Sequence, residues 1–117
     1  MDYLERRNLK TGEVLIKEGE ESHDLYLLMK GCLKVSVGKG AKKYEIETII
    51  PGKVVGEMSF LDLKPRSADV TAFQESTVAI IPRKQYEEFL RTLPDWLIKL
   101  QTTIISRLRD ANKKVII

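Results

Sequence analysis

The amino-acid sequence predicts an antiparallel β-sandwich or barrel followed by two α-helices. Short β-branched segments, separated by turn residues at regular intervals, fill the chain as far as Pro82. All seven glycines lie at or before Gly56, where tight turns are expected. Beyond Pro82 the spacing of apolar residues changes to that of a helix. Short strands at such spacing are typical of all-β sandwiches and barrels, so we expect a mainly β fold with a helical C-terminal part.

The expected strands are short and bounded by Gly, Pro or polar turns. Residues 33–37 and 44–50 alternate apolar and polar side chains, as half-buried strands do. Pro51 and Gly52 form a turn signal, because Pro fixes φ and Gly supplies a positive φ. The sequence predicts strands at 14–17, 24–30, 33–37, 44–50, 69–73 and 77–81.

Two helices are expected after the strands. Tyr86, Phe89 and Leu90 share one face of the first. Pro94 suits a helix start, where its missing N–H has no consequence, and about 22 residues then follow without Gly or Pro, a rod of ~33 Å. We expect the part of this rod beyond the sheet to pack on a partner. Its apolar stripe consists of Leu97, Leu100, Ile104, Leu108, Ala111 and Val115.

Length and charge indicate one small domain. The chain has 117 residues, with 20 Lys and Arg against 17 Asp and Glu, a net charge of +3. We expect a single domain over 1–117, with β structure over about 5–82 and helices over about 83–92 and 95–117. The charge is too small and too mixed to predict direct binding of nucleic acid.

Composition also excludes several classes of site. One cysteine, Cys32, excludes an intrachain disulfide and a Cys-based metal cluster. One histidine, His23, makes a metalloenzyme improbable, and we expect it to be exposed in a polar turn. The N-terminus lacks the apolar core of a signal peptide, and no apolar run is long enough to cross a membrane. We therefore expect a cytoplasmic protein without membrane insertion.

One segment between the expected strands carries candidate chemistry. Gly56 precedes a possible helical turn at 57–62, and Arg66 follows nine residues after Glu57. An arginine fork beside the first N–H groups of a helix suits a phosphate. The Glu57 carboxylate suits hydroxyl donors such as those of a sugar, and Ser67 adds a hydroxyl beside Arg66. Phosphate and sugar together indicate a nucleotide; the alternative interpretation is a surface ion pair between Glu57 and Arg66.

The same segment resembles a known motif. GEMSFL at 56–61 and PRSA at 65–68 resemble the phosphate-binding cassette of the cyclic nucleotide-binding domain family. The resemblance covers about 9–112 and implies an antiparallel β-roll, or jelly roll (double-stranded β-helix), with a cassette helix and two C-terminal helices, B and C. The matching flanks are GEVLIKEGE at 12–20, LYLLMKGCLKV at 25–35, PGKVVGE at 51–57, and 71–90.

The resemblance also implies a role for each cassette residue. Arg66 would bind the exocyclic phosphate of a cyclic nucleotide, and Glu57 the ribose 2′-hydroxyl. Gly56 and the amides near Met58 and Ser59 would meet the sugar-phosphate edge.

Two further positions complete the implied set. Ser67 would give the phosphate a hydroxyl and Ala68 a backbone N–H. Ser67 is compatible with cAMP, and a hydroxyl there serves cGMP as well, so both nucleotides remain candidates. Val55 departs from the family pattern, where Phe is common.

The ends of the chain depart further from the family. Only residues 1–9 precede the first expected turn, so the usual N-terminal helical segment is short or absent. The last helix resembles the dimerisation helix of bacterial catabolite activators, which implies a homodimer. Aligned in this way, Arg107, Ala111 and Asn112 are the candidate lid over the base, and Ala111 stands where those proteins have a hydroxyl residue.

The expected function is a non-catalytic, regulatory cyclic nucleotide sensor that binds cAMP, or cGMP, in signal transduction. No cofactor and no catalytic or metal-binding residue is expected. The alternative is a domain of the same fold that binds no ligand and serves dimerisation or docking. A metal-dependent enzyme with a β-barrel is disfavoured because one histidine is too few ligands.

Overall fold

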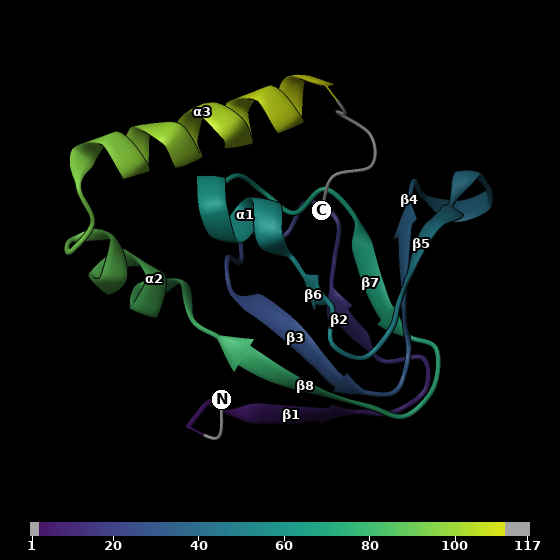
Figure 1. Ribbon diagram of the computed structural model, residues 1–117. Coiled ribbons are helices and arrows are strands. Elements are labelled where there is room, and N and C mark those ends of the chain that lie inside the picture. Colours follow the sequence, from purple (N-terminus) through teal and green to yellow (C-terminus); the bar gives the residue numbers. More distant parts are fainter. Residues whose placement is uncertain (1–2, 112–117) are drawn as a thin grey trace.

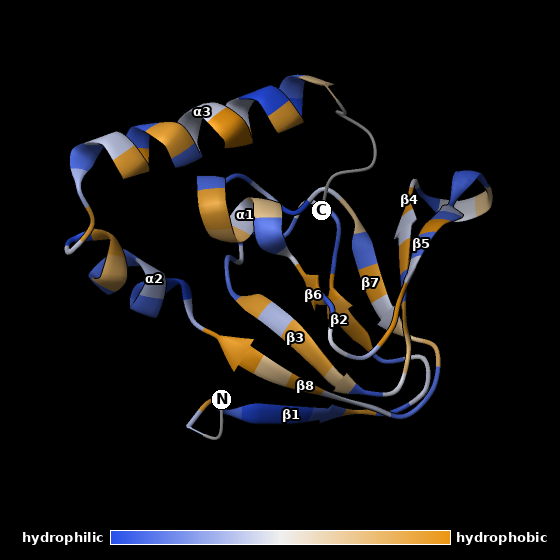
Figure 2. Ribbon diagram, in the orientation of Figure 1, coloured by the Kyte–Doolittle hydropathy of each residue, from blue (hydrophilic) through white to orange (hydrophobic). Residues whose placement is uncertain are grey.

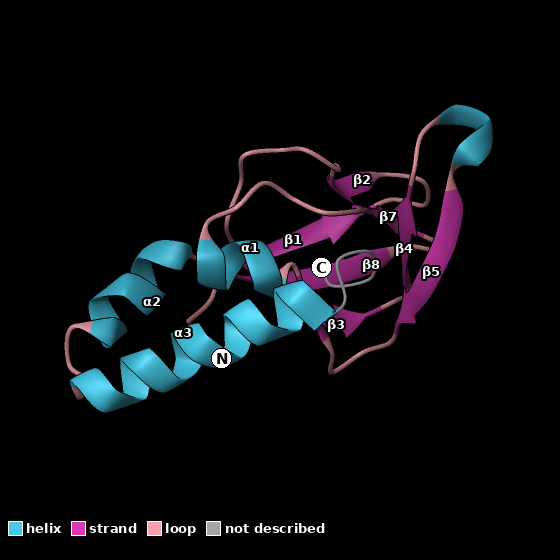
Figure 3. Cartoon of the chain, turned by 90° about the horizontal axis from the view of Figure 1, so that it is seen from above, coloured by secondary structure: helices cyan, strands magenta, loops and turns pink. Residues whose placement is uncertain are grey.

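Two four-stranded antiparallel sheets form the body of the protein, and the α-helices gather at one end of them (Figures 1 and 3). The computed structural model describes residues 3–111. In chain order the elements are β1 (Arg6–Leu9), β2 (Val14–Ile16), β3 (Leu25–Lys30), β4 (Leu33–Val37), η1 (Gly40–Lys42), β5 (Tyr44–Ile49), β6 (Val54–Val55), α1 (Glu57–Asp62), β7 (Asp69–Ala72), β8 (Ser76–Ile81), α2 (Arg83–Leu90) and α3 (Asp95–Ala111).

The sheets exchange strands repeatedly along the chain. One has the order β1-β8-β3-β6 and the other β2-β7-β4-β5, with antiparallel pairing throughout these orders. Strands neighbouring in sequence are therefore often placed in opposite sheets. This arrangement is the antiparallel β-roll with C-terminal helices that the cassette motif implied, and the prediction of the fold class is confirmed.

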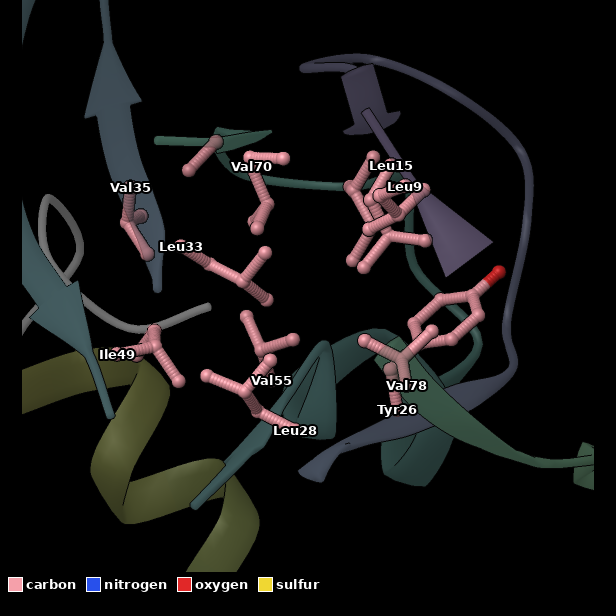
Figure 4. Close-up of a cluster of buried hydrophobic side chains, with 13 residues drawn as sticks. Leu9, Leu15, Tyr26, Leu28, Leu33, Val35, Ile49, Val55, Val70 and Val78 are labelled. Carbon is pink, nitrogen blue, oxygen red and sulfur yellow. The ribbon is translucent and has the colours of Figure 1, made fainter. Parts of the chain in front are cut away.

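Apolar side chains from both sheets meet between them and form the core (Figure 4). Leu28, Val55 and Val78 come from one sheet, and Leu33 and Val35 from the other; all five are 0% exposed. Burying a side chain of this size contributes roughly 1.5–3 kcal/mol. This core carries β6, and with it the start of the cassette, on a rigid base.

Two strands were not predicted individually, because their local sequence is weak. In β1 (Arg6–Leu9) only Leu9 is buried, and the strand exists through its register with β8 (Ser76–Ile81). Strand β6 (Val54–Val55) has two residues and pairs with β3 (Leu25–Lys30). Both segments are strands because they pair with a strand far away in the sequence, and their own residues give only a weak strand pattern.

Helix α3 lies across the end of the roll that α1 occupies, and much of its apolar surface is exposed (Figures 1 and 2). Trp96 is 67% exposed, Leu100 48%, Ile104 46% and Leu108 48%. These residues are spaced four apart and form one stripe, which we call the exposed α3 stripe. Leu97, the first member of the predicted stripe, is half-buried instead. Ala111 is exposed, and Val115 lies outside the described residues.

Within residues 3–111, no helix combines the length and the apolar character that crossing a bilayer requires.

Candidate functional site

The candidate site begins where β6 ends, at a glycine that no other residue can replace without strain. Gly56 has φ 87° and ψ 16°, in the left-handed region, and precedes the first residue of α1. A Cβ placed on it would lie 2.6 Å from Nη1 of Arg66 and 3.1 Å from Cδ1 of Ile16. The backbone therefore needs glycine twice over, for its φ and for the approach of the arginine.

Arg66 reaches this glycine from the loop after α1 and is almost fully buried, with 3% of its surface exposed. Its Nη1 donates to the Gly56 carbonyl at 3.0 Å, and its Nη2 to the Asp24 carbonyl at 2.7 Å. Its Nε donates to Ser22 Oγ at 3.0 Å. Burial lowers the pKa of the guanidinium, and Tyr26 together with nearby carboxylates partly opposes that effect.

Glu57, the first residue of α1, does not pair with that arginine. Among the residues described, no ion pair joins Glu57 to Arg66, and Oε2 of Glu57 is buried without a hydrogen-bond partner. Burial raises the pKa of Glu57; its own backbone N–H opposes this, Glu47 adds to it, and Arg66 opposes it. The interpretation of Glu57 and Arg66 as a surface ion pair is therefore wrong: one is buried and the other is unpaired.

The remaining cassette residues surround these two groups. Ser59 is 1% exposed and its Oγ has no hydrogen-bond partner. Met58 and Ala68 are each 2% exposed. Ser67 is half-buried beside Arg66. The first hydrogen bond of α1 runs from Phe60 N–H to the Gly56 carbonyl, so the amides of Met58 and Ser59 precede the bonded turns.

The far end of α1 is held by α2. Arg83, the first residue of α2, donates from Nη1 to the carbonyls of Phe60 and Leu61. The rings of Phe60 and Tyr86 pack with their centroids 4.9 Å apart. The Arg83 backbone N–H donates to Asp24 Oδ1 at 3.1 Å, while the Asp24 carbonyl receives Arg66. The cassette helix and its arginine therefore share one support.

Helix α3 contacts the cassette through an ion pair. Arg109 donates to Asp62, at the end of α1, from Nε at 2.5 Å and from Nη2 at 3.0 Å. Burial acts to raise the pKa of Asp62, but hydrogen bonds from Arg109 and from the Lys64 backbone outweigh it and the net pKa is lowered. Tyr86 of α2 donates its hydroxyl proton to Gln101 Oε1 of α3 at 2.5 Å. These contacts hold α3 over α1 (Figure 1).

The candidate lid residues lie elsewhere on this helix. Arg107 and Ala111 are exposed, and Asn112 lies outside the described residues. Their role over a base stays a prediction. The arginine of α3 that contacts the cassette is Arg109, two residues beyond Arg107.

Several residues around the site had no assigned role in the sequence. Ser22 and Asp24 belong to a polar turn that carries no motif, yet both hold Arg66. Their neighbour His23 is half-buried rather than exposed, and its Nδ1 has no partner. Arg109 continues a half-buried row of Leu97, Gln101 and Ile105 at four-residue spacing, and this row is visible only in the structure.

A cavity away from the cassette offers less chemistry. A cavity of about 530 Å³ lies over the outer face of the β2-β7-β4-β5 sheet, where Lys34 and Lys43 line it. Lys43 pairs with Asp69 at 2.7 Å, and Lys34 with Glu45 at 3.6 Å. Within residues 3–111, no group of three or more His, Cys, Asp or Glu is placed to hold a metal ion.

Comparison with known proteins agrees with this geometry. The model of the cyclic nucleotide-binding domain matches residues 6–92. The chain belongs to this family. It is 28% identical over 113 residues to the cyclic AMP receptor protein of Thermus thermophilus, covering 96% of this chain and 52% of that protein. It is 30% identical over 115 residues to the Pycsar effector protein BcPycTIR of Burkholderia cepacia, covering 97% of this chain and 37% of that protein.

Solved structures show the same fold. The catabolite activator protein of Thermus thermophilus superposes with a TM-score of 0.73 at 28% identity, over 97% of this chain and 54% of that one. The cAMP-bound EAL enzyme Bd1971 gives 0.82 at 24% identity, over 92% of this chain and 29% of that one. The chain spans about half, or less, of the length of the curated relatives cited.

Proposed function

We propose that this chain is a non-catalytic sensor that binds cAMP at the cassette, with cGMP as the second candidate. In this proposal Arg66 binds the exocyclic phosphate and Glu57 the ribose 2′-hydroxyl. The backbone around Gly56, including the amides of Met58 and Ser59, meets the sugar-phosphate edge. The Ser67 hydroxyl and the Ala68 N–H complete the contacts to the phosphate.

The observation that carries the proposal is the unpartnered oxygen of Glu57. A buried carboxylate oxygen without a donor is costly, on the order of 1–3 kcal/mol. It persists here beside a buried arginine that the chain does not use to neutralise it. A ligand that offers a hydroxyl to Glu57 and an anion to Arg66 satisfies both groups, and a ribose cyclic phosphate offers both on one rigid ring.

The relatives support the same ligand class. One curated relative is a cyclic AMP receptor protein, and the EAL enzyme Bd1971 has been solved with cAMP and with cGMP bound. In this chain Ser67 suits either nucleotide, so the choice of base depends on groups beyond the cassette. No other cofactor is part of the proposal, and we expect a cytoplasmic location without direct binding to nucleic acid or insertion into a membrane.

The proposed output is the position of α3. This helix touches the cassette through Arg109 and Asp62 and touches α2 through Gln101 and Tyr86, so a ligand that moves α1 changes both contacts. A ligand shifts the helix only as far as it binds one helix position better than the other.

The exposed α3 stripe supports a homodimer. Four large apolar side chains, Trp96, Leu100, Ile104 and Leu108, lie on one helical face at four-residue spacing. A second copy of the same helix is the self-complementary partner for such a stripe. The alternative function, a docking module without ligand, would use the same stripe but would leave Glu57 unsatisfied.

Calorimetry with cAMP and cGMP tests the ligand. The wild-type protein is expected to bind cAMP with submicromolar to micromolar affinity and to return the nucleotide unchanged. Arg66→Ala is expected to lose at least about 100-fold in affinity, because a buried phosphate would lack its charged donor. Phe73→Ala, at an exposed side chain in the turn after β7, is the control. Affinity of Arg66→Ala equal to that of wild type would contradict the assignment.

Sedimentation tests the dimer. The wild-type protein is expected to be dimeric at tens of micromolar, and the double change Leu100→Glu with Ile104→Glu to give a monomer. Phe73→Glu adds a charge at a side chain of similar exposure and is expected to leave the dimer intact. A monomeric wild-type protein would argue against pairing through α3.

A further inference from the structure

The turn from Gly19 to Asp24 wraps around the phosphate-binding arginine. The Arg66 backbone N–H donates to the Glu20 carbonyl at 2.9 Å, and the Gly19 N–H donates to the Arg66 carbonyl at 2.8 Å. The side chain of Arg66 returns to the same turn through Ser22 and Asp24. Backbone and side chain of Arg66 are thus fixed by one short segment outside the cassette.

Ser22 supplies the side-chain hydroxyl in this group of contacts. Its hydroxyl donates to Glu20 Oε1 at 2.6 Å and accepts from Arg66 Nε at 3.0 Å. Because a hydroxyl has one proton, the bond to the Glu20 carboxylate directs that proton away from the arginine. The lone pairs of the oxygen are then left for Nε. The carboxylate of Glu20 also favours the charged state of Arg66.

The hydrogen bond from Arg66 Nε to Ser22 limits which N–H groups of the guanidinium can reach a ligand. A guanidinium has five N–H groups, and the chain uses three: Nε on Ser22, one on the Gly56 carbonyl and one on the Asp24 carbonyl. With Nε held, the guanidinium plane cannot rotate to present that edge to a ligand. The two N–H groups left over are one on Nη1 and one on Nη2, and these remain to donate to a phosphate.

We propose that Ser22 is a positioning residue that aims the Arg66 guanidinium at the phosphate, with Glu20 orienting the Ser22 hydroxyl. This inference rests on the proposed function of Arg66. Loss of the hydroxyl leaves Arg66 charged and near the site but free to turn, so binding weakens without being abolished. Threonine at position 22 keeps a hydroxyl on Cβ, so it can accept from Arg66 Nε and restore the orientation of the guanidinium.

The test compares Ser22→Ala, Ser22→Thr and the control Thr77→Ala by calorimetry with cAMP. Thr77 donates to Asn8 at 3.0 Å on β8 and β1, so its loss removes a hydrogen bond away from the cassette. Ser22→Ala is expected to raise the Kd about 5- to 30-fold, less than Arg66→Ala. Ser22→Thr and Thr77→Ala are expected to stay within about twofold of wild type.

A spectroscopic readout follows the arginine directly. In the ligand-free protein the ¹⁵Nε–¹Hε resonance of Arg66 is expected to move in Ser22→Ala and to return toward the wild-type position in Ser22→Thr. Urea unfolding shows whether each variant is folded. Wild-type affinity in Ser22→Ala, with Arg66→Ala deficient, would overturn the role of Ser22 alone. A wild-type protein that binds neither cAMP nor cGMP would overturn the proposed function and this role with it.

Discussion

Of the three arginines that attach the cassette to the rest of the protein, Arg66 and Arg109 act near opposite ends of α1 and in different ways, while Arg83 binds carbonyls of α1 from α2. Arg66 is 3% exposed and is held by the carbonyls of Gly56 and Asp24 and by Ser22. Arg109 reaches the other end of the cassette helix from α3 and pairs with Asp62, with 21% of its side chain exposed. The first attachment has no carboxylate partner, and the second is a bidentate ion pair.

The difference separates binding from readout. A guanidinium satisfied by neutral carbonyls and a hydroxyl keeps its charge uncompensated by a direct ion pair, so it can still attract an anion. Arg109 is already neutralised by Asp62, so it has little left for a ligand. It is suited instead to hold α3 against α1 with a strength that a conformational change can overcome.

The largest effect on binding is expected from Gly56→Ala, which disturbs the contacts that hold the Arg66 guanidinium. A non-Gly residue at φ 87° costs about 1–2 kcal/mol, and the new Cβ would also lie 2.6 Å from Arg66 Nη1. We expect the variant to lose measurable cAMP binding by calorimetry as well as stability in urea.

Gly52→Ala is a matched control. Gly52 has φ 92°, but a Cβ there would meet nothing within 4 Å, so this variant carries the backbone strain without the collision. It is expected to lose similar stability and to keep its affinity. Equal cAMP affinities for Gly56→Ala and Gly52→Ala would show that the close contact between Gly56 and Arg66 does not matter for binding.

A smaller effect with opposite signs is expected from Glu57→Gln. Since burial raises the pKa of Glu57, its ionised form destabilises the folded protein, and this effect grows as the pH rises from the ordinary Glu pKa through the raised one. The variant is therefore expected to be more stable than wild type at pH 7 without ligand. It should bind cAMP about tenfold more weakly or worse, because a charged acceptor is lost. Thermal melts at pH 7 measure the stability, and calorimetry measures the affinity for cAMP. A variant less stable than wild type would contradict the conclusion that the buried, ionised Glu57 destabilises the folded protein.

The smallest effect is expected on the Arg109 side. Arg109→Gln is expected to lower the free energy of unfolding by about 1 kcal/mol at pH 7. The pKa of Asp62 is lowered in the folded protein, so its contribution is complete above the ordinary Asp pKa of about 3.9 and is lost as the pH falls through the lower folded value. Urea unfolding of both proteins at pH 7 and near pH 2 is expected to show the difference shrinking with acid.

Exchanging the two charges tests whether Asp62 and Arg109 stabilise the protein through their contact with each other. Asp62→Arg and Arg109→Asp are each expected to destabilise the docking of α3, and the double variant to recover part of the loss. If the double variant is no better than the sum of the single ones, the two side chains are not coupled.

The sequence by itself determined most of the strands, the position of the cassette and the arginine at its centre. Alternation at 33–37 and 44–50, glycine turns and the helical period after Pro82 are local signals, and the elements they predicted are present. Gly56, Glu57 and Arg66 lie within eleven consecutive residues, so their proximity needs little of the fold. The short strands β1 and β6 escaped prediction because each is made by pairing with a strand far away in the chain.

Only the tertiary structure decided what surrounds and supports those residues. Ser22 and Asp24 meet Arg66 across more than 40 residues of sequence, and Arg109 meets Asp62 across 47. Nothing local marks a serine in a polar turn as a partner of a distant arginine, since polar turns are also the usual form of a solvated loop. Helical spacing placed the residues of α3 on faces, but which face is covered depends on where the roll, α1 and α2 lie against it.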